Sequence, residues 1–333
     1  GFGRIGRQAL RIMQESHPDM NVVLINDLTD GETLAHLFEF DSTYGKYDCG
    51  GACYKDGLLS TKHGKIRTTA CKDPSTLPHK ELDVDVVLEC TGVFRDKKGC
   101  ELHLKAGAKK VLMSAPAKDE IDGTFVLGVN EELYDNATMH IVSNASCTTN
   151  CLAPMAKVLH DNFGIKSGLM TTIHSYTNDQ RLLDLPHKDM RRARSAPQNI
   201  IPTTTGAAVA VGLVLPELAG KLDGMSVRVP TPTGSLTDLT VLVDKATDVE
   251  AVNAAFKKAS EGAMKGILGY EERPLVLTDY VGDPRSSIID ALSTKVIISE
   301  DGSCMIKALS WYDNEWGYSN RLVDFAKLMC EKL

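Results

Sequence analysis

The chain begins Gly1-Phe2-Gly3-Arg4-Ile5-Gly6, and this stretch decides how the first half of the sequence is interpreted. It fits the pattern G-x-G-x-x-G, and residues with helical spacing follow it at once. Glycines in this pattern permit a tight turn and let the backbone approach a pyrophosphate closely. The helix N-terminus that follows directs N–H groups and the positive end of its dipole at the phosphates. The stretch therefore predicts a dinucleotide-binding loop.

Asp27 lies about 20 residues further on, at the end of a buried strand predicted over 21–26. A carboxylate there can accept both ribose hydroxyls and would repel a 2′-phosphate, which favours NAD over NADP as the cofactor. The alternatives are an ordinary turn for the glycines and a helix cap for Asp27. Because such a loop normally follows a strand, we also expect a strand with a few apolar residues ahead of Gly1.

The pattern of strands and helices divides the chain in two. In the first half, β-rich runs at 21–26, 84–89 and 110–114 alternate with helical spacing over 7–15 and 97–106, which predicts βαβ units and a parallel sheet. Later strands are longer and several alternate apolar with polar residues, as in a half-covered antiparallel sheet. These strands are predicted at 168–176, 225–229, 236–243, 286–291, 295–298 and 305–312.

The predicted fold class is therefore α/β with two domains. Residues 1–146 form a Rossmann-type, NAD-binding parallel-sheet domain that lacks its first strand in this sequence. Residues 147–314 form a mixed α+β catalytic domain with a largely antiparallel sheet. A C-terminal helix within 315–333 carries an apolar stripe and is expected to pack back onto the first domain.

Composition excludes several classes of protein. The net charge of −7 argues against nucleic acid as the primary partner, and the basic run at 188–194 is interpreted as a solvated loop or an interface. No stretch approaches the roughly 20 apolar residues of a membrane helix, and no signal peptide is recognised, so we expect a cytoplasmic protein without a membrane partner.

Nine cysteines in such a chain predict free thiols rather than a disulfide framework. Two pairs with a four-residue offset, Cys49 with Cys53 and Cys147 with Cys151, have the spacing of metal ligands. Neither pair has a nearby histidine or second cysteine pair to complete a tetrahedral site, so no metal is expected.

Cys147 is the candidate reactive thiol because it lies where a predicted strand gives way to a helix. Unpaired N–H groups and the dipole at a helix N-terminus stabilise a thiolate, and the same N–H groups can stabilise an oxyanion. His174, at the end of the next strand, is the candidate base. The alternatives are a buried inert thiol and a structural histidine, and spacing alone leaves both open.

The segment Ser143-Asn144-Ala145-Ser146-Cys147-Thr148-Thr149-Asn150 resembles the active-site signature of phosphorylating glyceraldehyde-3-phosphate dehydrogenases. The resemblance covers essentially the whole chain, through motifs at 1–6, 26–27, 174–186, 203–208, 228–232 and 311–315. It implies NAD-dependent oxidation of glyceraldehyde 3-phosphate with inorganic phosphate to 1,3-bisphosphoglycerate, through a thiohemiacetal and a thioester on Cys147. It also implies a homotetramer in glycolysis, with residues 178–199 as an intersubunit loop.

The resemblance implies a role for each matching residue. Cys147 is the nucleophile, and His174 activates it and moves protons. The positions that match the inorganic-phosphate site are Ser146, Thr148, Thr205 and Gly206. Those on the substrate-phosphate side are Thr177, Asp179 and Arg228, with Arg194 close by. Those that match cofactor contacts are Gly1, Gly3, Arg4, Ile5, Gly6, Asp27, Lys72, Ser114 and Asn314.

The sequence departs from the family pattern at two places. Residues 233–237 differ from the usual Asn-Val-Ser-Val-Val, and Lys72 stands where an arginine with a planar stacking group is common. Two rival functions are considered. Erythrose-4-phosphate dehydrogenases differ after the histidine, where residues 175–179 here resemble the triose enzyme. A non-enzymatic NAD-binding interaction protein would be expected to have lost Cys147, His174 or Arg228, and all three are present.

Overall fold

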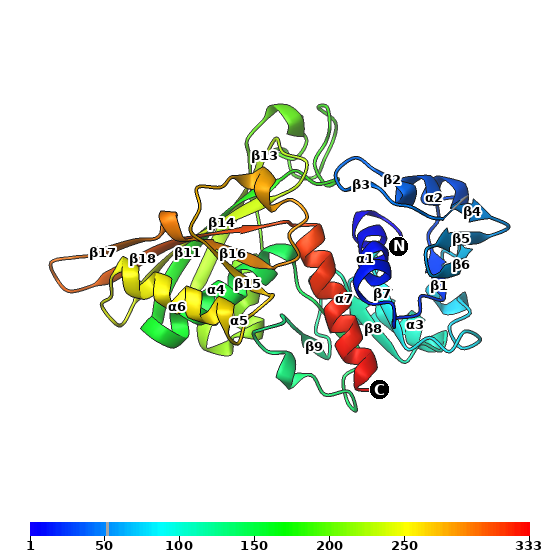
Figure 1. Ribbon diagram of the computed structural model, residues 1–333, viewed down its shortest axis with the longest axis horizontal. Helices are drawn as coiled ribbons and strands as arrows, with labels where there is room; N and C mark the ends of the chain where they lie inside the picture. The colour runs from blue at the N-terminus through cyan, green and yellow to red at the C-terminus, as the bar shows by residue number, and fades with distance from the viewer. Residues whose placement is uncertain (51–52) are drawn as a thin grey trace. The chain divides into compact units, whose positions relative to one another are not determined.

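The computed structural model describes residues 1–50 and 53–333, and the chain divides into two compact units (Figure 1). Unit 1 comprises Gly1–Phe125, Glu132–Ala145 and Ser319–Leu333, and unit 2 comprises Val126–Glu131 and Ser146–Tyr318. No helix in the described part of the chain is long and apolar enough to cross a membrane.

Unit 1 contains the parallel strands predicted from the alternating pattern. One sheet has the order β7-β8-β10-β9 and is parallel throughout, with bounds Val86–Glu89, Lys110–Met113, Ile141–Ser143 and Gly123–Thr124. The other has the order β1-β6-β5-β4, with bounds Leu24–Asn26, Gly64–Thr69, Leu58–Thr61 and Tyr54–Lys55, and only its β1–β6 pair is parallel. Strands β2 (Phe40–Asp41) and β3 (Gly45–Lys46) form a separate antiparallel pair.

The helices of unit 1 are amphipathic. They are α1 (Arg4–Ser16), α2 (Gly31–Glu39), α3 (Lys97–Lys105) and the part of α7 (Trp316–Glu331) that begins at Ser319. The 3-10 turn η1 (Pro74–Thr76) also belongs to unit 1, and η2 (Glu131–Leu133) begins on the last residue of a unit 2 segment and continues into unit 1. The apolar stripe predicted for α7 is buried, and Phe325 stacks on Phe125 with ring centroids 5.1 Å apart. A cavity of about 690 Å³ lies where β1 and β7 end their sheets. A strand ahead of Gly1 would fit there, but that strand stays a prediction.

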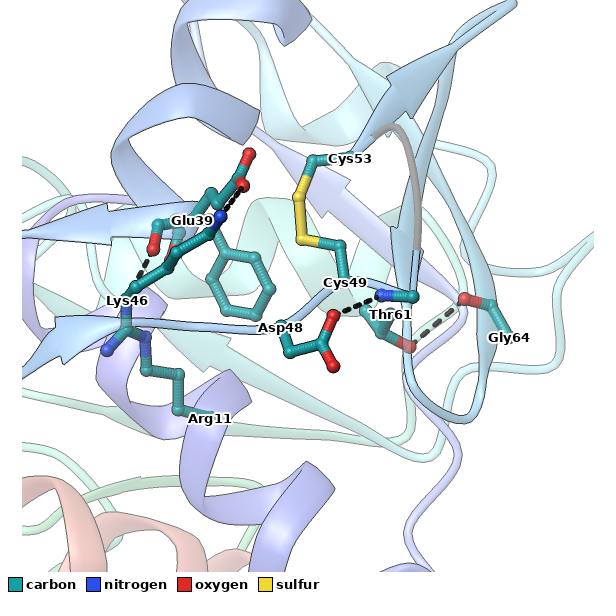
Figure 2. The surroundings of a disulfide bond; sticks show 10 residues. Arg11, Glu39, Lys46, Asp48, Cys49, Cys53, Thr61 and Gly64 are labelled. Atoms are coloured by element: carbon teal, nitrogen blue, oxygen red, sulfur yellow. Dashed lines mark hydrogen bonds and ion pairs between the residues drawn. A yellow bond between two sulfur atoms is a disulfide. The ribbon is translucent and has the colours of Figure 1, made fainter.

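Cys49 and Cys53 form a disulfide, so the prediction of free thiols is wrong for this pair (Figure 2). Their Cα atoms are 5.5 Å apart, a usual separation for a disulfide, and both side chains are buried in the core cluster that contains Phe38 and Tyr47. The other seven cysteines are free thiols. Composition cannot reveal such a pair, because the bond depends on where the folded chain places the two cysteines.

Unit 2 is built on one mixed sheet, as predicted. Its strand order is β12-β13-β11-β14-β18-β16-β15, with bounds Ile201–Thr204, Leu222–Val229, Ile165–Ser175, Ser235–Val243, Cys304–Tyr312, Ser287–Asp290 and Leu268–Glu271, and β17 (Lys295–Ile298) also pairs with β18. The β11–β13 and β15–β16 pairs are parallel, and the remaining pairs are antiparallel.

Helices and 3-10 turns complete unit 2. The helices are α4 (Cys147–Phe163), α5 (Ala207–Val214) and α6 (Val249–Glu261), and α4 packs on strands β11, β14, β16 and β18 (Figure 1). The turns are η3 (Ala196–Gln198), η4 (Pro216–Leu218), η5 (Leu277–Tyr280) and η6 (Ala291–Ser293). Alternate residues of β14 are buried, which is the period-2 pattern of a strand covered mainly on one face.

Candidate active site

Cys147 is the first residue of α4, and Ser146 caps this helix. The Ser146 Oγ accepts a hydrogen bond of 3.0 Å from the N–H of Thr149. The preceding residue, Ala145, has a φ of 55°, in the left-handed region that a non-glycine residue occupies only at an energetic cost. This sharp turn places the thiol at a helix N-terminus, where the sequence predicted it.

The His174 imidazole lies beside the thiol, with its Nε2 3.5 Å from the Sγ of Cys147. Its Nδ1 lies 2.7 Å from the carbonyl oxygen of Ser175, which can only accept a hydrogen bond. The carbonyl therefore favours the tautomer with its proton on Nδ1, which leaves Nε2 as an acceptor facing the thiol. A nucleophile and a base within reach of each other form the pairing that covalent catalysis needs.

The surroundings shift the pKa values of both members of this pair. Burial and the positive charge of Arg228 lower the pKa of His174 to about 3. Burial also raises the pKa of the Cys147 thiol, while Arg228 and hydrogen bonds with Thr148 act in the opposite direction. Burial thus opposes the charged form of both groups, while Arg228 and the hydrogen bonds with Thr148 favour the thiolate. His174 lies where it can accept the thiol proton when the sulfur attacks.

Arg228 supplies a half-buried positive charge next to this pair. It is the register partner of His174 across β13 and β11, and its Nη1 donates a 3.0 Å hydrogen bond to the Ser175 carbonyl. The Nη1 also lies 2.7 Å from His174 Nδ1. Because that nitrogen carries a proton in the favoured tautomer, it cannot accept, and Nη1 donates to the Ser175 carbonyl instead. Within the described residues Arg228 forms no salt bridge, and its buried Nε has no partner. Such a cation suits an anionic ligand.

Two helix N-termini meet at this site. The Thr149 Oγ1 in the first turn of α4 donates a 3.4 Å hydrogen bond to the carbonyl of Ala207, the first residue of α5. The Thr205 Oγ1 accepts a 3.2 Å hydrogen bond from the Ala207 N–H. A Cβ on Gly206 would meet no atom of the described residues within 4 Å, so there is space beside this helix end. Helix N-termini attract anions through their N–H groups. The four predicted inorganic-phosphate residues, Ser146, Thr148, Thr205 and Gly206, thus lie at these two helix ends.

The structure separates the predicted residues on the substrate-phosphate side. Thr177 donates its N–H to Gln180, and Asp179 pairs with Arg192, whose Nε donates a 2.6 Å bond to Thr203. Arg194 instead pairs with the exposed Asp184. Arg192 is close enough to affect the pKa of Arg228. Arg192 is therefore the better candidate, and the sequence could not choose between two arginines in one basic run.

Tyr312 is a second residue to which the sequence assigned no role, although it lies in the motif at 311–315. Its hydroxyl lies 2.9 Å from the Thr148 hydroxyl and 2.9 Å from the Thr172 hydroxyl, and its ring packs edge-on against His174. Strand order brings Tyr312, at the end of β18, near Thr172 on β11, and the packing of α4 on the sheet brings it near Thr148. A sequence offers no local signal for such a contact.

In unit 1, the glycine loop has the features of a pyrophosphate cradle. Helix α1 begins at Arg4, and its N-cap, Gly3, makes no side-chain cap bond. A Cβ on Gly6 would come within 2.3 Å of the Gly1 carbonyl oxygen, and one on Gly1 within 2.7 Å of the Thr91 backbone. A Cβ on Gly3 would meet nothing within 4 Å, so that side of the loop is open. The N–H groups at the start of α1 therefore suit a phosphate ligand.

Asp27 lies against this loop. Its Oδ2 accepts a 2.7 Å hydrogen bond from the Phe2 N–H, and its Oδ1 accepts a 3.0 Å bond from the Thr29 N–H. These bonds hold the pKa of Asp27 below its usual value although burial acts to raise it, so the side chain is a carboxylate. The donor set fits a dinucleotide, with N–H groups for the phosphates and a carboxylate for the ribose hydroxyls.

The other predicted cofactor residues are divided between the two units. In unit 1, Arg4 pairs with Asp41 at 2.5 Å, Ile5 is half-buried, Lys72 is exposed, and Ser114 donates its N–H to the Glu89 carbonyl. In unit 2, the Asn314 Oδ1 accepts bonds from the Ser175 hydroxyl, the Gly234 N–H and the Ser235 hydroxyl. These three bonds fix the Asn314 amide and leave its Nδ2 as the donor.

Comparison with known proteins agrees with both halves of this description. The profile described as "Glyceraldehyde 3-phosphate dehydrogenase, NAD binding domain" matches residues 1–97. The profile described as "Glyceraldehyde 3-phosphate dehydrogenase, C-terminal domain" matches residues 146–314, which include Cys147, His174 and Arg228.

Curated relatives match over the whole chain. The glyceraldehyde-3-phosphate dehydrogenase of Geobacillus stearothermophilus is 57% identical over 333 residues, which cover 100% of this chain and 97% of the relative. Glyceraldehyde-3-phosphate dehydrogenase 1 of Bacillus subtilis is 56% identical with the same coverage, and glyceraldehyde-3-phosphate dehydrogenase 2 of Streptomyces avermitilis is 55% identical over 100% of this chain and 98% of the relative. This confirms the resemblance noted in the sequence, and the chain belongs to the glyceraldehyde-3-phosphate dehydrogenase family, as an NAD-dependent oxidoreductase that acts on an aldehyde group.

Proposed function

We propose that this enzyme oxidises glyceraldehyde 3-phosphate with NAD and uses inorganic phosphate to release the product as 1,3-bisphosphoglycerate. The observation that carries the proposal is the half-buried Arg228, whose Nε is buried without a partner, which has no salt-bridge partner among the described residues and which lies beside Cys147 and His174. A cation that is partly removed from water and has no counter-ion is costly, so the site favours a substrate that brings its own negative charge.

In the first step, the Cys147 sulfur attacks the aldehyde carbon while the Nε2 of His174 accepts the thiol proton. His174 then donates this proton to the aldehyde oxygen, so the product is a thiohemiacetal with a hydroxyl group and the Nε2 is again free to accept a proton. The N–H groups at the start of α4 are placed to stabilise the negative charge that develops on the aldehyde oxygen. When bound, NAD supplies the acceptor for the hydride that leaves this carbon. His174 accepts the hydroxyl proton in the oxidation, and a thioester on Cys147 remains.

In the second step, an oxygen of inorganic phosphate attacks the thioester carbon, and the carbon–sulfur bond breaks. We assign the attacking phosphate to Ser146, Thr148, Thr205 and Gly206 at the two helix N-termini. We assign the substrate phosphate to Arg228, Thr177 and Asp179, with Arg192 in place of Arg194. The released thiolate regains a proton from His174, which returns the pair to its starting state.

We assign cofactor binding to residues 1–146 with the C-terminal helix, and catalysis to residues 147–314. The loop at Gly1–Gly6 would hold the pyrophosphate and Asp27 the ribose hydroxyls. Arg4, Ile5, Lys72 and Ser114 would line the rest of the site, and Asn314 would offer its amide Nδ2 to the nicotinamide amide.

We also propose a homotetramer that acts in the cytoplasm. Support for assembly comes from apolar side chains that this chain leaves exposed on the loop at 178–199, namely Leu182, Leu183, Leu185 and Met190. Two more, Leu169 and Met225, lie exposed on the sheet of unit 2. Size-exclusion chromatography with light scattering measures the assembly directly, and a monomer would contradict it.

The activity is tested by NADH absorbance with glyceraldehyde 3-phosphate, NAD and inorganic phosphate. We expect steady turnover with phosphate and at most one NADH per site without it, because the thioester then persists. Erythrose 4-phosphate is the control substrate and should turn over more slowly. Equal steady turnover with and without phosphate would contradict the phosphate-dependent second step.

A further inference from the structure

We propose that Tyr312 is a positioning residue, whose hydroxyl directs the hydrogen of Thr148 toward the attacking inorganic phosphate and whose ring holds the His174 imidazole. The proposal rests on the proposed function, because it takes Thr148 to be a phosphate ligand. It adds a residue from a strand that contributes none of the residues assigned above.

The hydroxyl of Tyr312 joins two threonines from different elements. Its Oη lies 2.9 Å from the Oγ1 of Thr148 on α4 and 2.9 Å from the Oγ1 of Thr172 on β11. All three side chains are buried, with exposed fractions of 2%, 5% and 1% for Tyr312, Thr148 and Thr172. The bridge therefore ties the residue after Cys147 to the strand that carries His174.

The chemistry of an anion sets the direction of these two hydrogen bonds. Phosphate oxygens mainly accept hydrogen bonds, so Thr148 binds the anion by donating its hydroxyl hydrogen. Its oxygen is then free to accept from Tyr312, and the phenol oxygen accepts from Thr172. Burial raises the pKa of Tyr312, so the phenol keeps the hydrogen that this arrangement needs. Hydrogen bonds in such a chain polarise one another and strengthen the last donor.

The ring of Tyr312 acts on His174. The two ring centroids are 6.0 Å apart with an interplanar angle of 76°, an edge-to-face contact. Tyr312 is paired with Ser235, and Ser235 with His174, so the two rings lie in one row across β18, β14 and β11, which neighbour one another in the sheet (Figure 1). Because Ser175 already holds Nδ1, the ring contact restricts the remaining rotation of the imidazole.

The two roles are separated by two variants and a matched control. Tyr312→Phe removes only the hydroxyl, and Tyr312→Leu removes the ring as well. Tyr280→Phe removes another buried hydroxyl of unit 2, from a tyrosine that stacks on Trp311 next to the site residue. The probe is inorganic phosphate, measured by its protection of Cys147 from alkylation by iodoacetamide, with thermal unfolding as a check on the fold.

We expect Tyr312→Phe to raise the phosphate concentration for half-protection about tenfold, the effect of losing one hydrogen bond, and to leave the pH midpoint of alkylation unchanged. Tyr312→Leu should change both quantities, and Tyr280→Phe neither. In a Thr148→Val background, Tyr312→Phe should have no further effect, because the hydroxyl acts through Thr148.

Half-protection that is unchanged in Tyr312→Phe, or that still rises tenfold in the Thr148→Val background, would overturn the role of the hydroxyl. A pH midpoint that Tyr312→Leu leaves in place would overturn the role of the ring. Absence of phosphate protection in the unsubstituted enzyme would overturn the proposal as a whole. The assay needs neither aldehyde nor NAD, so failure to oxidise glyceraldehyde 3-phosphate would count against the proposed function alone.

Discussion

Asp27 accepts a 2.7 Å hydrogen bond from the backbone N–H of Phe2, so the carboxylate proposed to bind ribose also holds the glycine loop. Removing the whole side chain would therefore change the loop and the charge together. Asparagine separates these effects, because its side-chain oxygen can still accept from Phe2 while its charge is gone.

We expect Asp27→Asn to raise the ratio of kcat/KM for NADP to that for NAD about tenfold or more, since it removes the repulsion of a 2′-phosphate. Asp27→Ala should also weaken NAD binding, because the loop loses its acceptor. Initial rates with each cofactor measure the ratio. A ratio that stays the same in Asp27→Asn would exclude Asp27 as the residue that selects against NADP.

His174→Asn should lower the rate of the first NADH turnover by a factor on the order of 10² to 10⁴, the usual contribution of a general base. The same variant should slow the alkylation of Cys147 by iodoacetamide at neutral pH. Stopped-flow absorbance measures the first turnover, and His36→Asn, at an exposed helical position, is the matched control. Labelling at the unsubstituted rate would remove His174 from thiol activation.

Stability should fall as the pH drops below about 6.5 because His79 is buried and neutral. Burial and the neighbouring His103 lower the pKa of His79 to about 4, so between roughly pH 6.5 and 4 the unfolded chain binds a proton that the folded chain does not. The loss is at most about 1.4 kcal/mol per pH unit for this group. The stability that depends on neutral His79 is therefore fully present above pH 6.5 and is lost progressively as the pH falls toward 4.

His79→Leu removes this titration, so its free energy of unfolding should fall less steeply from pH 6.5 to 4.5 in urea titrations. The carboxylate of the neighbouring Glu89 accepts a 3.0 Å hydrogen bond from His103. Because the pKa of Glu89 is also lowered, its protonation adds a further loss of stability, which begins only near pH 4.5. His36→Leu is the control. If the free energy of unfolding fell equally steeply with pH in all three proteins, His79 would bind its proton in the folded chain as readily as in the unfolded chain, which would contradict this account.

The Cys49–Cys53 disulfide should contribute about 2 kcal/mol to the free energy of unfolding, a value near the lower end for a short loop. Urea unfolding of the Cys49→Ser, Cys53→Ser double variant without reductant measures this loss. With reductant, the unsubstituted and double-variant proteins should have similar midpoints. Cys71→Ser, at a free thiol, is the control. Identical midpoints without reductant would mean that the two thiols are free.

The sequence predicted the features that depend on local pattern. Alternating strands and helices predicted the parallel sheet of unit 1, and a strand-to-helix junction identified Cys147 as a thiol at a helix N-terminus. The pattern did not predict β4, β5 and β6 within 54–69, where strands are short and turn residues are frequent. It also did not predict that burial would raise the pKa of Cys147, because burial is a property of the packed site.

Features that depend on distant pairing could not be predicted. Arg192 and Arg194 lie two positions apart in one basic run, and only the folded loop directs the first to Asp179 and the second to Asp184. Tyr312 reaches Thr148 across 164 positions of sequence. Such contacts follow from strand order and register, which a single sequence does not specify.

The central claim is that the Cys147 sulfur carries the acyl group between the two half-reactions. The direct test is mass spectrometry of the enzyme quenched after mixing with glyceraldehyde 3-phosphate and NAD in the absence of phosphate. We predict an acylated peptide that contains Cys147, which disappears when phosphate is added and never forms in Cys147→Ser, although that variant still binds NAD. NADH formation without any acylated Cys147 peptide, or substantial turnover by Cys147→Ser, would contradict the account.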